Sequence, residues 1–210
     1  LDMLFVDHGV FRVLYLNRHR LAPDAWRSAQ PTPGQIRRMA RRDGLRTIVN
    51  LRGESEFGSW ALEREACEEA GVDLVVAKLR SRAAPTRQTI EEVAEMLERI
   101  EYPALFHCKS GADRAGLMSA LFLLLREKRP AAEAADQLHW RFGHFRHAKT
   151  GVLDHVIGLY AKAEREAAAC GETLDFLDWA RVDYSPRAAE AGFADDRRIT
   201  WLVDRVLKRE

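Results

Sequence analysis

The sequence has almost no net charge: 33 Lys and Arg face 32 Asp and Glu among 210 residues, which leaves a formal charge of +1. Proteins that bind nucleic acid by broad charge neutralisation normally carry a large basic excess, so we expect no nucleic-acid partner. Disordered chains are poor in apolar residues, whereas 47% of this sequence is hydrophobic. The composition therefore indicates an ordinary globular fold with a hydrophobic core.

Long apolar runs are missing as well. The longest, from Leu117 to Leu125, is interrupted by Ser119 and falls well short of the roughly 20 apolar residues that cross a bilayer. We therefore expect no integral membrane segment and interpret this run as a buried helix. The first residues carry no secretory signal pattern, so we predict a cytoplasmic protein; the start at Leu1 leaves open whether the N-terminus is truncated.

Cysteine is scarce and odd in number. Cys67, Cys108 and Cys170 are widely spaced, which argues against a disulfide framework and for a reduced compartment or one functional thiol. Cys67 and Cys170 fall in predicted helices among Ala and Glu, where a free cysteine is usually only a small apolar residue. Cys108 is therefore the candidate functional thiol.

Strands and helices alternate in the first half of the sequence. We predict strands at 11–17, 25–29, 47–51, 72–78 and 104–107, and helices at 33–43, at 55–70 and from Pro85 to just before Pro103. This alternation predicts an α/β fold with a central, mostly parallel sheet flanked by helices. The C-terminal half is expected to be helical, at 115–128, 131–141, 150–169, 173–183 and 196–209. We expect a single domain over 1–210, in which 171–210 could form a helical C-terminal appendage.

One segment carries residues suited to chemistry. It reads His107-Cys108-Lys109-Ser110-Gly111-Ala112-Asp113-Arg114 and lies between a predicted buried strand and the apolar helix. A loop in that place turns backbone N–H groups and the positive end of the helix dipole toward one point, which suits an anion such as phosphate. Gly111 allows the backbone to curl. The predicted phosphate-binding residues are Lys109, Ser110, Gly111, Ala112, Asp113 and Arg114.

Cys108 and Arg114 flank this loop. Backbone N–H groups and a nearby guanidinium stabilise the thiolate form of a cysteine, which is the nucleophilic form. The planar fork of Arg114 can hold two oxygens of a phosphoryl group and stabilise charge in the transition state, which a lysine cannot do bidentately. We therefore predict that Cys108 and Arg114 are catalytic.

The spacing His107-Cys108-x5-Arg114 resembles the Cys-x5-Arg signature of the protein tyrosine phosphatase superfamily. Two upstream segments, Arg27-Ser28-Ala29-Gln30-Pro31 and Thr47-Ile48-Val49-Asn50-Leu51-Arg52, look like early strands of compact bacterial tyrosine or dual-specificity phosphatases. The likeness extends from Trp26 to Tyr160. It implies a phosphatase-like fold, a phosphocysteine intermediate on Cys108 that water hydrolyses, and no metal or organic cofactor.

The proton donor departs from the usual pattern of this superfamily. Most members place an Asp on a loop after an earlier strand, but the segment from Leu79 to Arg87 contains no carboxylate. Asp113 is the candidate within the signature, and its pairing with Arg114 resembles that of myotubularin-like lipid phosphatases. The alternative is that Asp113 only braces the loop through a salt bridge, with Glu54 and Glu56 as outside candidates for the acid.

Some neighbouring residues have supporting or open roles. His107 is expected to hydrogen-bond locally and orient the loop, and Arg52 either points into the phosphate cleft or pairs with Glu54. Ala115 stands where many superfamily members carry Ser or Thr, so we expect slow breakdown of the phosphocysteine. The segment from Trp140 to Arg146 could form a substrate wall or serve only in helix packing. The spacing of four histidines in the helical region does not fit zinc-ligand patterns, so we expect no metal; they are His139, His144, His147 and His155.

The distribution of charge bears on the substrate. Basic residues without an intervening acid predict a positive rim beside the phosphate loop; they are Lys78, Arg80, Arg82 and Arg87. The expected partner is a phosphorylated protein, bearing phosphotyrosine or a dual-specificity site, or a phosphoinositide or inositol phosphate. Two other functions stay open: a pseudophosphatase that binds phosphorylated ligands without turnover, and a rhodanese-like sulfurtransferase.

Overall fold

A five-stranded sheet forms the centre of the computed structural model, which describes residues 16–54 and 58–194. The strand order is β1-β2-β5-β3-β4; β1 runs antiparallel to β2, and the other neighbouring strands are parallel. The predicted α/β fold with a mostly parallel sheet is thus confirmed. The strands are β1 (His19–Ala22), β2 (Ala25–Ala29), β3 (Thr47–Asn50), β4 (Asp73–Val76) and β5 (Ala104–Cys108).

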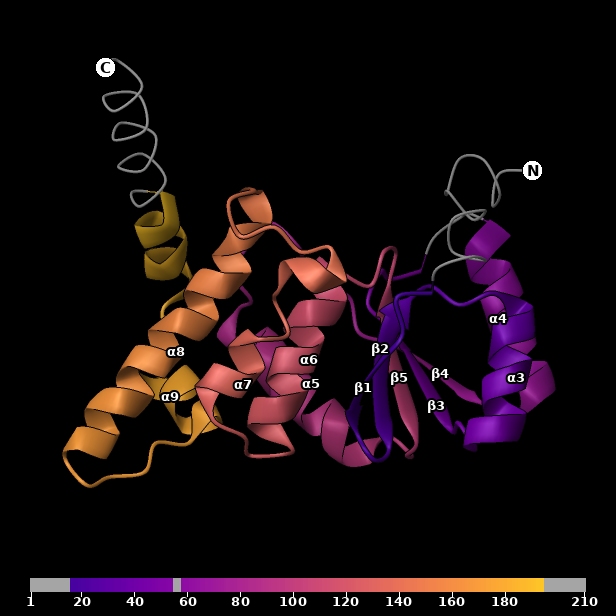
Figure 1. Cartoon of the computed structure of the whole chain (residues 1–210), viewed down its shortest axis with the longest axis horizontal. Coiled ribbons are helices and arrows are strands. Elements are labelled where there is room, and N and C mark those ends of the chain that lie inside the picture. Colours follow the sequence, from indigo (N-terminus) through magenta and orange to yellow (C-terminus); the bar gives the residue numbers. More distant parts are fainter. Residues whose placement is uncertain (1–15, 55–57, 195–210) are drawn as a thin grey trace, which may run out of the picture.

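Helices cover both faces of this sheet (Figure 1). On one face lie α3 (Pro33–Asp43) and α4 (Gly58–Ala70), and on the other lie α5 (Arg87–Arg99) and α6 (Asp113–Leu125). Beyond α6 lie further helices of the C-terminal half, among them α7 (Ala131–Ala135), α8 (Val152–Ala169) and α9 (Phe176–Val182). Two short 3₁₀ turns, η1 (Trp140–Phe142) and η2 (Lys149–Gly151), connect α7 to α8.

The two faces of the sheet have separate apolar cores because successive strand side chains point in opposite directions. In β5, Leu105 packs with the α3 and α4 side, whereas Phe106 packs with the α5 and α6 side. Every residue of α6 from Ala115 to Leu125 is buried, so the apolar run is a core helix, as predicted. The helix that follows the predicted phosphate loop is therefore anchored in the core from Ala115 to Leu125.

Some elements differ from the prediction. The first strand is β1 at His19–Ala22, where it pairs with β2 across a tight turn; of the predicted 11–17, residues 11–15 lie outside the described part. The helix predicted at 131–141 ends at Ala135, because the chain after it turns back toward the phosphate loop. Residues 186–194 are helical, since Pro186 suits the first turn of a helix rather than ending one. The helix predicted at 196–209 lies outside the described residues.

The residues after 171 share the main core. Phe176, Trp179 and Tyr184 are buried in the same cluster as α5 and α6, and the Tyr184 hydroxyl donates a hydrogen bond of 2.8 Å to the Pro85 carbonyl. The single domain over 1–210 and the appendage at 171–210 stay predictions. Within the described ranges, no helix is both long and apolar enough to cross a membrane.

Candidate active site

Cys108 ends the central strand of the sheet. β5 lies between β2 and β3, and α6 begins at Asp113, five residues after Cys108. Open parallel sheets bind ligands at the carboxyl ends of their strands. The predicted segment therefore has the strand, loop and helix arrangement that the sequence indicated, with Cys108 at the carboxyl edge and only 2% exposed.

Three consecutive backbone carbonyls of the loop accept hydrogen bonds from side chains on one side of it. The Asn17 amide donates to the Ser110 carbonyl at 3.0 Å, and the Arg27 guanidinium donates to the carbonyls of Gly111 and Ala112 at 2.7 and 3.0 Å. In a trans peptide the N–H of the next residue points away from the carbonyl. The N–H groups of Gly111, Ala112 and Asp113 therefore face the opposite side of the loop. No side chain caps the N-terminus of α6, which leaves its first N–H groups available to an anion.

Arg27 lies directly behind the loop. Its side chain is completely buried, it donates a further hydrogen bond of 2.6 Å to the Gln137 carbonyl, and its guanidinium carbon lies 4.1 Å from the centre of the Phe142 ring. Burial lowers the pKa of Arg27 to about 10, while the electrostatic interaction with Cys108 works against that shift. Arg27 thus stays charged near neutral pH and can hold the loop as a cation.

Gly111 provides the close contact between the loop and β2. Its φ is +76°, and a Cβ atom at this position would lie 2.6 Å from the Ala29 nitrogen and 2.8 Å from the Ser28 carbonyl carbon. Any other residue would therefore combine an unfavourable backbone conformation with a backbone overlap. The glycine within the signature is required by this packing as well as by the curl of the loop.

His107 belongs to a buried polar network beneath the loop. Its Nε2 atom lies 2.5 Å from Glu63 Oε1, and Glu63 also accepts hydrogen bonds from the amides of Gln30 and Asn50. Burial raises the pKa of Glu63, but the charge and hydrogen bond of His107 together with the two amides lower it overall. Arg52 donates a hydrogen bond to the Gln30 side chain, which places Arg52 beside this network at the end of β3.

Asp113 is bound to a buried histidine. The Nδ1 atom of His144 lies 2.7 Å from Asp113 Oδ1, and its Nε2 atom lies 2.6 Å from Asp154 Oδ2 on α8. Burial lowers the pKa of His144, but the two hydrogen-bonded carboxylates outweigh burial and raise it to about 9. His144 is therefore an imidazolium between two carboxylates. Groups of three or more side chains able to hold a metal ion are absent from the described residues.

Arg114 faces a cavity with other cations. This open cavity of about 530 Å³ is lined by Arg114 and by residues 79–83, which include Arg80 and Arg82 and no acidic residue. Arg80 and Arg82 of the predicted positive rim thus lie beside the end of the loop, whereas Arg87 of that rim donates hydrogen bonds to the Tyr184 and Val182 carbonyls. Of the other loop residues, Lys109 is half-buried and Ser110 is exposed.

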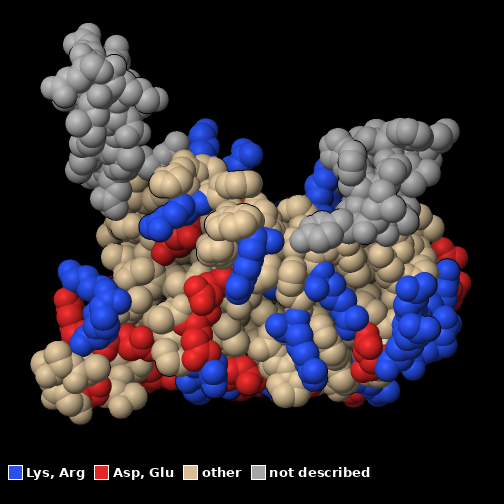
Figure 2. Space-filling model, in the orientation of Figure 1, with Lys and Arg blue, Asp and Glu red and all other residues tan. Residues whose placement is uncertain are grey.

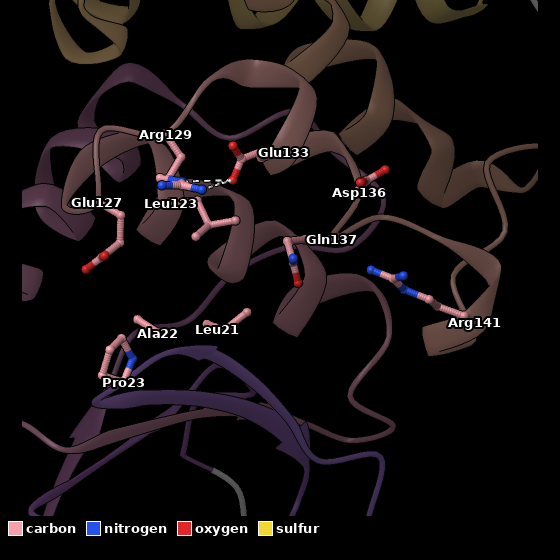
Figure 3. Close-up of a pocket in the computed structure, with 10 residues that line it drawn as sticks. All are labelled: Leu21, Ala22, Pro23, Leu123, Glu127, Arg129, Glu133, Asp136, Gln137 and Arg141. Atoms are coloured by element: carbon pink, nitrogen blue, oxygen red, sulfur yellow. Dashed lines mark hydrogen bonds and ion pairs between the residues drawn. The ribbon is translucent and has the colours of Figure 1, made fainter.

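A second cavity, of about 400 Å³, lies between the β1–β2 hairpin and helices α6 and α7 (Figure 3). Its lining includes three acidic side chains, Glu127, Glu133 and Asp136, and Glu133 pairs with Arg129 at 2.8 Å. A phosphate dianion would meet more negative than positive charge there. Of these two cavities, the one at Arg114 is better suited to a phosphorylated ligand.

The chain matches one family model over residues 17–151, more than half of its length: "DSP-PTPase phosphatase fused to NAD+ Kinase". The chain belongs to this family. Membership in the family, abbreviated PTP-NADK, confirms the predicted resemblance to the tyrosine phosphatase superfamily. The matched range contains the whole Cys-x5-Arg segment together with Arg27 and His144.

Solved structures share the fold of this PTP-NADK family member. TpbA of Pseudomonas aeruginosa is 20% identical with a TM-score of 0.53, over 70% of this chain and 90% of that one. The catalytic domain of the PP-IP phosphatase SIW14 of Saccharomyces cerevisiae is 20% identical with a TM-score of 0.55, over 75% of this chain and 94% of that one. At this identity the likeness shows the fold. No curated protein matches the chain in sequence.

Sequence reasoning missed three residues that hold this site together: Asn17, Arg27 and His144. Arg27 was noted only as part of a strand, although an arginine in a buried strand is unusual and could have signalled a buried acceptor. His144 was grouped with three other histidines as a doubtful zinc site. Asn17 has a φ of 49°, which asparagine tolerates better than most residues, but the sequence carries no sign of this.

Proposed function

We propose that this protein is a cysteine-dependent phosphatase that hydrolyses phosphate monoesters. The observation that carries the proposal is the row of carbonyls at Ser110, Gly111 and Ala112, held back by Asn17 and Arg27 at the end of the strand that bears Cys108. This arrangement turns a row of N–H groups to the other side of the loop, where they would bind phosphate oxygens and stabilise the transition state.

The reaction proceeds in two displacements. The Cys108 thiolate attacks phosphorus, a sulfur–phosphorus bond forms, and the bond from phosphorus to the leaving oxygen breaks. Arg114 binds two of the phosphoryl oxygens throughout. Water then attacks the same phosphorus and gives one proton to the Asp113 carboxylate, the sulfur–phosphorus bond breaks, the thiolate is regenerated and inorganic phosphate is released. Ala115 provides no hydroxyl to assist departure of the thiolate, so the second step is slow.

Asp113 protonates the leaving oxygen, and His144 supplies the proton. The imidazolium holds a proton 2.7 Å from Asp113 Oδ1, and a bound phosphate dianion favours its transfer to the carboxylate because like charges repel. Asp154 keeps the ring oriented by binding the other nitrogen at 2.6 Å. Bracing of the loop and acid catalysis are therefore two roles of the same ion pair.

Asp113→Asn is expected to lower turnover of a poor leaving group, such as an alkyl phosphate, by about 100-fold, the usual contribution of a general acid. Turnover of an activated aryl phosphate, whose leaving group needs no proton, should fall much less. The measurement is the dependence of kcat on leaving-group pKa for the wild type and the variant. An equal loss on both substrates would remove Asp113 from the acid role.

The stability of the protein is expected to fall as pH rises through about 9. His144 has a folded-state pKa of about 9, above its ordinary value of 6.5, so its stabilisation is complete below pH 6.5 and is lost as the imidazolium deprotonates. The shift corresponds to about 3 kcal/mol of unfolding free energy. Urea unfolding between pH 6 and 10 measures it, and His144→Gln should show a flatter profile. A wild-type profile as flat as that of the variant would contradict the ion pair.

The cationic cavity favours substrates with more than one negative group. Arg80 and Arg82 join Arg114 there, so a phosphate monoester flanked by further phosphates or carboxylates gains additional attraction. A neighbour with the same fold, SIW14, is described as a PP-IP phosphatase, which supports an inositol phosphate or phosphoinositide as much as a phosphoprotein.

The test of the proposed function is an activity panel on the purified full chain. The substrates are an aryl phosphate, phosphopeptides, inositol phosphates and phosphoinositides, with thiosulfate and cyanide as the sulfurtransferase control. Release of phosphate from any phosphorylated substrate is expected. Sulfur transfer without phosphatase activity would indicate the rhodanese-like alternative, and ligand binding without turnover would indicate a pseudophosphatase.

A further inference from the structure

The segment between α7 and α8 exposes aromatic and basic side chains together. Trp140 is 71% exposed and Phe145 is 64% exposed. Of the five large hydrophobic side chains exposed in the described part of the chain, these two are the aromatic ones. Exposed cations alternate with them in sequence, and we call the set Trp140, Arg141, Phe145, Arg146 and Lys149 the aromatic–cationic surface.

This surface adjoins the phosphate loop. The Asn17 amide that binds the Ser110 carbonyl also donates to the Phe142 carbonyl at 2.9 Å, so one side chain joins the two segments. His144 binds Asp113 at 2.7 Å. The exposed Phe145 is thus the residue next to His144, and Trp140 lies two residues before Phe142. The aromatic–cationic surface is thus joined to the phosphate loop through Asn17 and His144.

After Asp136, the segment between α7 and α8 carries basic residues and no acidic ones. No Asp or Glu occurs between Asp136 and Asp154 in the sequence. Among the residues that the structure describes, Arg141, Arg146 and Lys149 have no carboxylate within ion-pair distance. Arg80 and Arg82, which line the cavity at Arg114, add two further cations on a molecule of nearly zero net charge. Figure 2 shows Lys and Arg side chains along the upper rim of the molecule, where the segment between α7 and α8 lies in Figure 1.

Exposed Trp and Phe interleaved with Arg and Lys are the features that bind proteins to the interface of an anionic bilayer. The rings insert at the level of the headgroups, and each cation near the surface is attracted to anionic lipid. We propose that the aromatic–cationic surface docks this protein onto an anionic lipid bilayer, with the phosphate loop facing phosphorylated lipid headgroups. The choice of headgroup as substrate rests on the proposed phosphatase function, whereas the docking does not.

A phosphopeptide partner fits these observations less well. Peptides are usually held in an apolar groove or along a sheet edge. The cavity beside Arg114 is lined by three arginines, a serine and two small or aliphatic residues, with no aromatic side chain to pack on a phosphotyrosine ring. A small, highly charged headgroup matches this lining better than an aryl ring does.

The test is co-sedimentation of the full chain with vesicles of phosphatidylcholine alone and of phosphatidylcholine with 30 mol% phosphatidylserine, which are the probes rather than the substrate. Binding to the anionic vesicles is expected, and it should weaken with salt because exposed charges are screened. Trp140→Ala with Phe145→Ala, and separately Arg146→Gln with Lys149→Gln, should each lower the binding constant by roughly tenfold or more.

Matched control variants come from other surfaces. Val182→Ala removes a side chain that is 73% exposed, and Arg41→Gln with Arg42→Gln removes two exposed cations from α3 on the other face of the sheet. Neither control should change vesicle binding. Wild-type protein that fails to bind anionic vesicles, or loss of binding in the controls equal to that in the test variants, would overturn the proposal.

Activity on a soluble aryl phosphate separates this proposal from the phosphatase function. The Trp140 and Phe145 double variant should keep that activity and lose turnover of a phosphorylated lipid in vesicles. An active enzyme that ignores vesicles contradicts the docking alone. A protein that binds vesicles but hydrolyses no phosphate ester contradicts the phosphatase function alone. Loss of phosphopeptide binding instead of vesicle binding in the double variant would assign the surface to a protein partner.

Discussion

Cys108→Ser is expected to lower turnover of an aryl phosphate by on the order of ten-thousand-fold or more, as removal of a catalytic nucleophile usually does. The serine hydroxyl keeps its proton at neutral pH. His107, the nearest base in sequence, does not remove that proton because its Nε2 atom is bound to Glu63 Oε1 at 2.5 Å. The loop itself keeps its shape, because its carbonyls are held by Asn17 and Arg27 rather than by the thiol. The variant should therefore still bind inorganic phosphate.

Steady-state rates and calorimetric phosphate binding measure the two parts of this prediction. The matched control is Cys170→Ser, because Cys170 is exposed at the end of α8 and should tolerate the change with full activity. Retained turnover in Cys108→Ser would exclude nucleophilic catalysis by this residue. Loss of phosphate binding along with turnover would indicate that the loop had collapsed.

Arg27→Met is expected to lower kcat/KM by about 100-fold or more although Arg27 is placed behind the loop and away from the substrate side. Without its guanidinium, the carbonyls of Gly111, Ala112 and Gln137 lose their donors, and the N–H groups opposite lose their fixed direction. Buried groups left without partners also cost stability, so the free energy of unfolding should fall by about 3 kcal/mol.

Urea unfolding and steady-state kinetics on the same preparations test this. Arg46→Met is the control, because Arg46 pairs with Glu101 at the surface, where its side chain is 57% exposed. A surface pair of this kind contributes at most about 1 kcal/mol, and the control should keep full activity. Arg27→Met with wild-type stability and activity would show that the loop holds its shape without this cation.

The sheet and its principal helices could be predicted because local sequence patterns determine them. β-branched residues mark β3 and β4, and Thr32 with Pro33 marks the start of α3, where the Thr32 hydroxyl accepts from the Gln35 N–H. The position of Cys108 follows for the same reason. A short buried strand before it and an apolar helix after it force the intervening residues into a turn at the edge of the sheet.

The contacts that shape the loop could not be predicted. Asn17 and Arg27 reach carbonyls that lie 93 and 84 residues away in sequence, and no local pattern specifies such a pairing. His144 was one of several histidines without a distinguishing feature until the return of the chain after α7 brought it to Asp113. The effect of His144 on Asp113 is electrostatic and depends on how deeply His144 is buried, and the spacing of residues in the sequence does not reveal burial.

The nearly zero net charge of the chain conceals segments in which all charged residues are basic. A net charge of +1 includes two acid-free sequence segments, one with Arg80 and Arg82 and one with Arg141, Arg146 and Lys149. Overall neutrality excludes a globally basic binder. It is compatible with a strong local attraction for anionic substrates and surfaces.

The most direct test of the account is rapid acid quench of the wild-type protein mixed with an excess of aryl phosphate. We expect a burst of aryl alcohol equal to the enzyme concentration, followed by a slower steady rate, with mass spectrometry placing one added phosphoryl group on Cys108. The burst follows from a slow second step at a site with Ala115 beside Arg114. Linear product release with full turnover and no phosphoryl group on Cys108 would contradict covalent catalysis by this residue.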